Sequence, residues 1–454
     1  MRTAKSGVIT ALALSAVLAW LAWPAPGPNV LLITVDGLRP DRLSCYGGAV
    51  PVPNLDWLAA NGVLFQHATT DVPWTTPALA TIMTGVGANR HQLRLPEQRL
   101  SERFETLAQR LQDAGWTTAA VVGAYPADHT TGLARGFGYY EDRYNAPMEY
   151  PKARIPRLPS ESFDDADAAR NYHARKATAD SRRTDEAVTD AAIGWLKRHG
   201  RRRFLLWVHY FGAQEQRDQL RAAEIERETL VRQYPEHVVR VDREIGHLID
   251  SLDERGWSDD TLVVVLGSHG QDLREHFFVG HGANVYEPGL RLPWVMRFPG
   301  RFHSGQRVAA AVQTADVLPT ILARLGVGAP AGLSGRDALA PDYVAGDSYA
   351  ETYLPATAVL STAVPFEGQQ VRLGFVARAV RSGSWKLIRS EPSALLDTKA
   401  PPPVPAALPA LFLREELYDL ANDPGETQNL LAAQPQIAAR LRQRLREFTA
   451  RGEG

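Results

Sequence analysis

Carboxylate and imidazole side chains stand at or near the ends of three apolar segments of this 454-residue chain. Asp36 ends the segment NVLLITVD, His209 is the next-to-last residue of FLLWVHY, and His269 follows TLVVVL after two small residues. Side chains of these types can transfer a proton or bind a metal ion. The three positions are therefore candidates for chemistry, provided that the fold brings them together.

The apolar segments themselves predict how these side chains are positioned. Uninterrupted apolar runs are typical of strands that are buried on both faces of a parallel sheet, and helical periodicity precedes the later ones. The expected strands are residues 29–36, 117–123, 204–210 and 261–266, and the expected helices are residues 105–114, 184–197 and 236–255. This alternation predicts an α/β fold with a doubly wound, mostly parallel central sheet flanked by helices. Ligand sites of such sheets lie at the carboxyl ends of the strands, so Asp36, His209 and the segment after Leu266 are expected to meet.

The composition excludes several classes of protein. Hydrophobic residues make up 44% of the chain, which is too many for a disordered protein. The 50 Lys and Arg residues are balanced by 51 Asp and Glu residues, so there is no net field to hold nucleic acid or an anionic membrane surface. The single cysteine, Cys45, excludes an intrachain disulfide and a Cys-rich zinc site.

The first 28 residues have the pattern of a targeting segment. Arg2 and Lys5 precede an uncharged apolar run over residues 8–23, and a proline-rich stretch follows. A helix of this length covers about 24 Å, less than the roughly 30 Å of a hydrocarbon core, which favours a signal peptide. No small-x-small cleavage site precedes Asn29, so an uncleaved membrane anchor is the alternative. The protein is expected to be exported, either periplasmic or extracytoplasmic, with membrane contact only through this segment.

The remaining chain is expected to form two units. Residues 29–342 contain the strand and helix alternation, and within them residues 145–183 are polar and contain prolines, which predicts a long surface excursion. Residues 343–454 are expected to form a smaller α+β subdomain, with an irregular stretch at residues 400–409 and a helix at residues 434–449.

A series of phrases in the sequence resembles the sulfatase family of the alkaline phosphatase superfamily, in the order in which that family has them. They are NVLLITVDGLRPDRLSCYG, PVPNLDWLAANGVLFQHA, PALATIMTG, VDREIGHLIDSLDERGWSDDTLVVVLGSHG, GHGANVYEPGLRLPWVMRFPG, ADVLPTILARLG, SGSWKLIRS and ELYDLANDPGETQNLL. The resemblance covers most of the chain. It implies a hydrolase of sulfuric or phosphoric esters, a divalent cation such as Ca²⁺, and a small-molecule or glycan ester as substrate.

The resemblance places Thr75 at the position of the family's nucleophile. Sulfatases carry C/S-x-P-S-R there, with a Cys or Ser that becomes formylglycine, whereas this chain has Thr75, Thr76, Pro77, Ala78 and Leu79. Threonine cannot become formylglycine, so Thr75 would have to attack directly as an alkoxide with a lowered pKa. The alternative is that Thr75 only caps the helix that begins before Pro77.

The resemblance implies Asp36 and His269 as metal ligands and His281 as a second catalytic residue, in contact with the transferred oxygens. Several family positions are replaced: Gly37 follows Asp36 where a second aspartate is common, and the family's S-D-H-G is Gly267, Ser268, His269, Gly270 before Gln271. The phrase H-x-x-D-P-H-x-P-Y also departs after His209. Because Ca²⁺ takes 6 to 8 oxygen ligands, tight binding to this set is not expected.

Two functions follow. The first is a sulfatase-like hydrolase with impaired activity, in which Thr75 attacks, Asp36 and His269 hold a metal ion, and His281 contacts the transferred group. The second is a catalytically inactive sulfatase-fold protein that serves as a cell-envelope binding or scaffold protein. The fold phrases are intact, while the replacements are concentrated at Gly37, Leu79, Gly212, Gln214, Ser268 and Gln271. A membrane-tethered transferase ranks last, because several membrane helices and disulfides would be expected.

Overall fold

The computed structural model describes residues 28–95, 98–143, 183–199, 203–214, 227–276, 279–354, 363–366, 369–372, 374–393 and 414–450. The predicted targeting segment, nearly all of the polar excursion at residues 145–183, and the irregular stretch at residues 400–409 lie outside these residues. No helix in the described ranges is long and apolar enough to cross a membrane.

An eight-stranded sheet forms the centre of the molecule, in the order β10-β2-β9-β6-β1-β5-β3-β4. Its strands are β1 (Asn29–Asp36), β2 (Val63–Thr69), β3 (Thr117–Val122), β4 (Tyr139–Glu141), β5 (Phe204–Tyr210), β6 (Thr261–His269), β9 (Arg291–Arg297) and β10 (Gln306–Gln313). Every neighbouring pair is parallel except the two pairs that β9 makes, with β2 and with β6. The predicted α/β fold with a mostly parallel sheet is confirmed.

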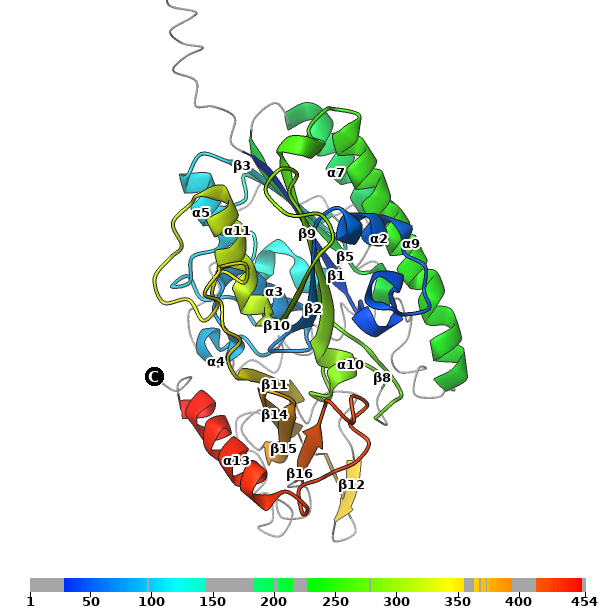
Figure 1. The fold of residues 1–454 in the computed structure, drawn as a ribbon, viewed down its shortest axis with the longest axis vertical. Coiled ribbons are helices and arrows are strands. Elements are labelled where there is room, and N and C mark those ends of the chain that lie inside the picture. The colour runs from blue at the N-terminus through cyan, green and yellow to red at the C-terminus, as the bar shows by residue number, and fades with distance from the viewer. Residues whose placement is uncertain are drawn as a thin grey trace, which may run out of the picture.

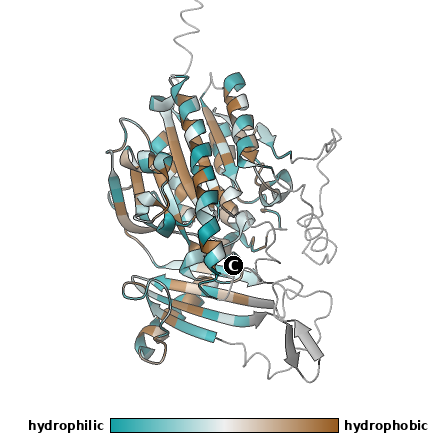
Figure 2. Cartoon of the chain, turned by 90° about the vertical axis from the view of Figure 1, so that its right-hand side faces the viewer, coloured by the Kyte–Doolittle hydropathy of each residue, from teal (hydrophilic) through white to brown (hydrophobic). Residues whose placement is uncertain are grey.

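Helices cover both faces of this sheet (Figure 1). The helices are α2 (Pro53–Ala60), α3 (Thr75–Thr84), α4 (Ala88–His91), α5 (Leu107–Asp113), α7 (Asp185–His199), α9 (Arg227–Asp253), α10 (Glu287–Leu290) and α11 (Val317–Leu325). The apolar side chains of α2, α7 and α9 pack in one core layer, and those of α3, α5 and α11 pack in the other. Figure 2 shows hydrophobic strands between helices whose outer faces are hydrophilic.

A second, antiparallel sheet lies at the carboxyl-terminal end of the chain, in the order β11-β14-β15-β16. It consists of β11 (Ser348–Leu354), β14 (Gly374–Ser382), β15 (Trp385–Ser393) and β16 (Arg414–Asp419), and helix α13 (Pro435–Ala450) packs on it. Two short pairs complete the fold: β7 (Asp272–Leu273) with β8 (Val279–Gly280), and β12 (Ala363–Phe366) with β13 (Gln369–Arg372).

Candidate functional site

Asp36 is the centre of a buried polar cluster at the carboxyl edge of the main sheet. Strand β1 lies between β5 and β6, so His209 is in register with Thr34, and His269 is in register with Asp36. The carboxylate of Asp36 is completely buried. The strand register therefore brings the ends of β1, β5 and β6 together, as the sequence analysis predicted.

Both oxygens of the Asp36 carboxylate accept hydrogen bonds from hydroxyl groups. Thr75 Oγ1 donates to Asp36 Oδ2 over 2.6 Å, and the Ser268 hydroxyl donates to Asp36 Oδ1. Thr75 is the first residue of α3, after Trp74, and no side chain caps the helix. The interpretation of Thr75 as an N-cap is therefore wrong: its hydroxyl is directed at Asp36 and not at the first turn of its own helix.

His269 presents a lone pair to the Thr75 hydroxyl. Its Nδ1 lies 2.8 Å from the carbonyl oxygen of Gly270, which can only accept, so we assign the proton to Nδ1. Nε2 is then the free acceptor, 3.3 Å from Thr75 Oγ1 and 3.6 Å from Asp36 Oδ1. Burial lowers the pKa of His269 more than Asp36 raises it, so this imidazole is neutral.

His209 faces Asp36 from the other side. Thr34 Oγ1 accepts a hydrogen bond from Trp207 Nε1 over 2.9 Å and lies 2.8 Å from His209 Nδ1. His209 Nε2 is buried, lies 3.7 Å from Asp36 Oδ2, and has no hydrogen-bond partner among the described residues. Burial alone would raise the pKa of Asp36, but His209, His269 and the Ser268 hydrogen bond lower it well below its usual range, so Asp36 is ionised. The sequence analysis expected His209 at this edge but gave it no role.

His281 joins the cluster through ring contacts. Its ring is stacked on His269 with 4.4 Å between centroids, and it meets the Trp74 ring edge to face at 5.3 Å. The following residue, Gly282, has φ of 83°, and a Cβ there would lie 2.3 Å from the Trp74 ring. A glycine is therefore required for the Trp74 ring to pack against this loop and cover the cluster.

The cluster is closed. Asp36, Ser268, His209 and His269 have no exposed surface, and Thr75 is 2% exposed. Arg39, on the loop after β1, is directed elsewhere, because its guanidinium bonds Asp41 at 2.9 Å and Glu275 at 2.8 Å. The cluster thus holds an ionised Asp36 beside a neutral His269, closed off from solvent.

The donors present do not fit the hard divalent cation that the sulfatase resemblance implies. One carboxylate, two imidazoles and two hydroxyls supply too few oxygens for a cation that takes 6 to 8, and both Asp36 oxygens already accept hydrogen bonds. Within the described ranges, no group of three or more His, Cys, Asp or Glu side chains is arranged to hold a metal ion. The expectation that Asp36 and His269 hold such an ion therefore finds no support in the donor set.

Two of the replaced family positions have structural roles. Leu79 is buried among apolar side chains of the core layer that contains α3. At Gly212 a Cβ would lie 1.7 Å from Asp185 Oδ2, and the Gly212 N–H donates to Asp185 Oδ1 over 3.2 Å. Leu79 therefore serves packing, and Gly212 leaves the room that Asp185 needs at the junction of β5 with α7.

The sulfatase family model matches residues 28–327, which is well over half of the chain. The chain belongs to the sulfatase family. Human arylsulfatase A is 26% identical over 95% of this chain and 89% of its own length. The multifunctional alkaline phosphatase superfamily protein PehA of Trinickia caryophylli is 26% identical over 68% of this chain and 76% of its own length.

Solved sulfatase structures share the fold. The phosphonate monoester hydrolase of Agrobacterium radiobacter superposes with a TM-score of 0.66 at 19% identity, over 94% of this chain and 96% of that one. A structure described as a 2-O GAG sulfatase gives a TM-score of 0.69 at 17% identity, over 94% and 93% of the two chains. These likenesses confirm the sulfatase-like architecture of the chain.

Proposed function

We propose that this sulfatase-family chain hydrolyses sulfuric and phosphoric esters poorly or not at all, and that it acts as a binding protein of the sulfatase fold. One observation carries the proposal: both oxygens of the Asp36 carboxylate are bound by the Thr75 and Ser268 hydroxyls inside a closed cluster. The nucleophile position and the metal-ligand position are thus joined to each other by a hydrogen bond.

Charge supports this proposal. A sulfate or phosphate ester is an anion, and its hydrolysis needs positive groups that stabilise the oxygens of the transition state. The cluster offers an ionised Asp36 and a neutral His269. Losing one preorganised stabilising group typically costs about 2.7–4 kcal/mol of barrier, and here Gly37 and Ser268 stand where the family has further carboxylates for a cation.

The family supports the class of ligand that we propose, and residues 8–23 support the compartment in which we propose that the protein acts. One structural relative is described in complex with D-glucosamine-2-N,6-O-disulfate, a sulfated sugar. We propose a small-molecule or glycan ester of sulfate or phosphate as the ligand here. Residues 8–23 support export of the protein, to the periplasm or to the outer face of the membrane.

A second candidate is direct hydrolysis with Thr75 as the nucleophile. It is favoured by the position of Thr75 Oγ1, which lies within 2.6 Å of Asp36 Oδ2 and 3.3 Å of the unprotonated Nε2 of His269. Asp36 or His269 would take the hydroxyl proton as Thr75 Oγ attacks sulfur or phosphorus. The ester bond to the alcohol would break and the leaving oxygen would receive that proton, and a water molecule would then hydrolyse the Thr75 ester and restore the hydroxyl. A hydroxyl between two acceptors is the expected geometry of an activated nucleophile.

Metal content and turnover, measured on the same purified protein, distinguish the two. The protein is dialysed with and without Ca²⁺, Mn²⁺ and Zn²⁺, analysed for metal, and assayed with aryl sulfate, phosphate monoester, phosphate diester and phosphonate monoester. We expect the protein to retain no metal ion after dialysis. We also expect any turnover of these substrates to be the same in Thr75→Ala as in the unchanged protein. About one ion per chain, lost in Asp36→Ala together with Thr75-dependent turnover, would establish the hydrolase.

A further inference from the structure

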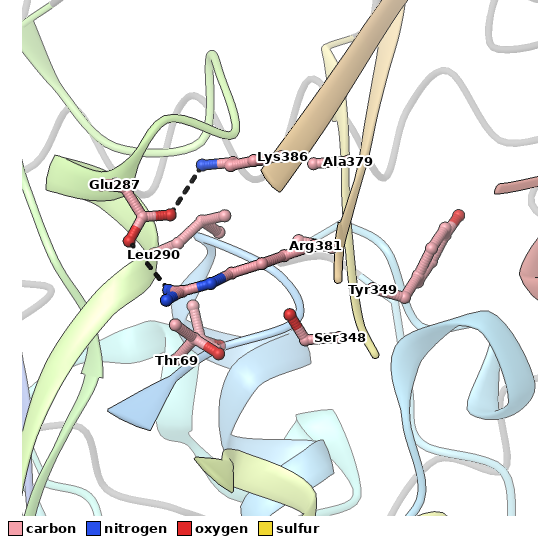
Figure 3. Close-up of a pocket in the computed structure, with 10 residues that line it drawn as sticks. Thr69, Glu287, Leu290, Ser348, Tyr349, Ala379, Arg381 and Lys386 are labelled. Carbon is pink, nitrogen blue, oxygen red and sulfur yellow. Dashed lines mark hydrogen bonds and ion pairs between the residues drawn. The ribbon is translucent and has the colours of Figure 1, made fainter. Parts of the chain in front are cut away.

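Two adjoining cavities lie between the main sheet and the carboxyl-terminal sheet, away from the Asp36 cluster. They share Thr69, Ser348 and Arg381, and we call them together the interdomain groove. Figure 3 shows the first of the two, with Glu287 and Lys386 in its lining. The polar or charged residues that line it are His67, Thr69, Thr70, Glu287, Gln313, Asp316, Ser334, Arg336, Tyr343, Asp347, Ser348, Arg381 and Lys386. The proposed function names a sulfate or phosphate ester as the ligand without assigning it to a cavity.

The strand register builds one wall of the groove. Thr69 at the end of β2 is directly opposite Arg291 on β9 and Gln313 on β10. Side chains that are directly opposite on neighbouring strands point to the same face. A hydroxyl, a guanidinium and an amide therefore stand in a row, while Arg381 reaches the groove from β14 of the other sheet.

Two guanidiniums at the groove bond backbone carbonyls and no carboxylate directly. Among the described residues, Arg291 donates to the carbonyl oxygen of Gln66, at 3.4 Å, and Arg336 donates to the carbonyl oxygen of Val344, at 2.6 Å. Their charges still reach the carboxylates of Glu287 and Asp316, respectively. Neither guanidinium forms an ion pair with a carboxylate of the described residues. Two permanent positive charges beside a cavity attract an anion.

The carboxylates at the groove are already occupied. Asp347 bonds Arg444 at 2.6 Å. Asp316 accepts three hydrogen bonds, from the backbone N–H groups of Gln313 and Arg336 and from the Tyr343 hydroxyl. Glu287 is held by Lys386 at 2.8 Å, with Arg381 3.7 Å from its other oxygen.

Two hydroxyls and an imidazole complete the set of donors. Among the residues that the structure describes, the side-chain hydroxyls of Thr69 and Ser348 have no hydrogen-bond partner, so both can donate to a ligand. The pKa of His67 is lowered, first by partial burial and then by Arg291 and Arg381, which places this ring in the field of both guanidiniums. Neutral donors beside fixed positive charge are what a tetrahedral oxyanion requires.

Resting on the ligand class of the proposed function, we infer that the interdomain groove binds a sulfate or phosphate group. Arg336, Arg381 and the hydroxyls of Thr69 and Ser348 would hold it from the groove walls, and Arg291, in register with Thr69, would add positive charge beside the groove. The group can be a free ion or part of a sugar ester, since both present the same oxygens. The groove is made by both sheets, so a bound anion would also hold the two units together.

Isothermal titration calorimetry of the full protein at constant ionic strength tests this inference. The probes are inorganic sulfate, inorganic phosphate, glucose 6-sulfate and glucose 6-phosphate, with chloride as the baseline. We expect saturable binding of at least one probe, weakened about tenfold or more in the double variant Arg291→Gln/Arg336→Gln. Tighter binding of the esters would identify a sugar ester as the source of the anion, and equal binding would identify the free ion.

Three further proteins make the result decisive. Arg301→Gln removes the same charge beyond the opposite end of β9 and should bind as the unchanged protein does. Thr75→Ala should also bind unchanged, which separates the groove from the Asp36 cluster. If the double variant does not fold, Thr69→Val/Ser348→Ala replaces it, with the same expected loss. Absence of binding to every probe, or equal binding by the groove variants and Arg301→Gln, would overturn the inference.

Discussion

At the scale of single residues, Ser268 is the side chain that separates this cluster from a metal site. Its hydroxyl donates to Asp36 Oδ1 at the position where the family phrase has an aspartate. A second carboxylate there would repel Asp36 unless a cation lay between them. We therefore expect Ser268→Asp to destabilise the protein without divalent cations and to gain Ca²⁺ or Mn²⁺ affinity of at least about tenfold.

Calorimetric titration of the variant with Ca²⁺ and Mn²⁺ checks this prediction. Ser268→Asn is the matched control, because it has nearly the same size as aspartate but no charge. Equal metal affinity in Ser268→Asp, Ser268→Asn and the unchanged protein would show that the missing carboxylate is not what prevents metal binding at Asp36.

Asp71 provides a residue-scale prediction about pH. Its buried carboxylate accepts hydrogen bonds from Ala88 N at 2.6 Å and Thr81 Oγ1 at 3.1 Å, yet burial raises its pKa to about 6. In the unfolded chain the pKa is about 3.9, so between these values the folded state binds more protons than the unfolded state. This group therefore makes the folded protein less stable as the pH rises from about 4 to 6, by roughly 3 kcal/mol in total.

We expect Asp71→Asn to remove that loss. The free energy of unfolding of the variant, minus that of the unchanged protein, should increase by roughly 2–3 kcal/mol between pH 4 and pH 7 in urea titrations. His91, whose pKa burial lowers to about 3, has the opposite pH dependence, but it is present in both proteins and cancels. The exposed Asp259→Asn serves as control, and a pH-independent difference for Asp71→Asn would contradict the prediction.

The position of the polar side chains at the strand ends could be predicted from the sequence, whereas their hydrogen-bond partners could not. The apolar runs before Asp36, His209 and His269 were enough to place these side chains at one edge. The direction of the Thr75 hydroxyl toward Asp36 depends on how α3 packs against β6 and β1, which no local pattern encodes. For the same reason the sequence left a capping role open as the alternative for Thr75, a role that Thr75 does not have.

At the scale of elements, Lys386 of β15 joins the two sheets through buried charges. Its Nζ lies 2.8 Å from Glu287 Oε1 on α10 and 2.8 Å from Glu426 Oε1, after β16. All three side chains are buried. Removing one member of a buried ion network leaves charges without a partner, which typically costs about 3–5 kcal/mol.

We therefore expect Lys386→Met to lower the free energy of unfolding by about 3–5 kcal/mol in urea titrations. Arg389→Met on the same strand is the matched control, since Arg389 is partly exposed and bonds Glu391 at 3.3 Å at the surface. Surface pairs contribute about 0–1 kcal/mol, so the control should change little. Equal losses in both variants would mean that burial of the network has no energetic consequence.

Prolines explain why the sequence analysis missed β9 and shortened α9. Strand β9 contains Pro293, but the ladder with β2 shifts register at this point and the ladder with β6 begins at Trp294, so the missing N–H is not needed. Helix α9 continues through Pro235, although the predicted helix began after it. The Tyr234 hydroxyl donates to the carbonyl oxygen of Gly37 and accepts from Arg39 N, and these tertiary contacts hold the part of the helix before the proline.

At the scale of the whole molecule, the donor set at Asp36 leads to a prediction about metal removal. A ligand that binds only the folded state raises the melting temperature, so an enzyme with a tightly held ion loses stability in chelator. We expect the melting temperature of this protein to stay within about 1 °C when EDTA or EGTA replaces 1 mM Ca²⁺. A fall of several degrees in scanning calorimetry, absent in Asp36→Ala, would contradict this prediction.

The position of β1 in the middle of the sheet also has a consequence for how the chain is made. Asn29 contacts Thr261, 232 residues later, and Thr34 contacts His209, 175 residues later. During synthesis at about 5–20 residues per second, the first strand therefore waits roughly 10–45 s for its second neighbour. Until β6 has been made, the nascent chain lacks the β1–β6 ladder, so the centre of the sheet cannot close before more than half of the chain has been synthesised.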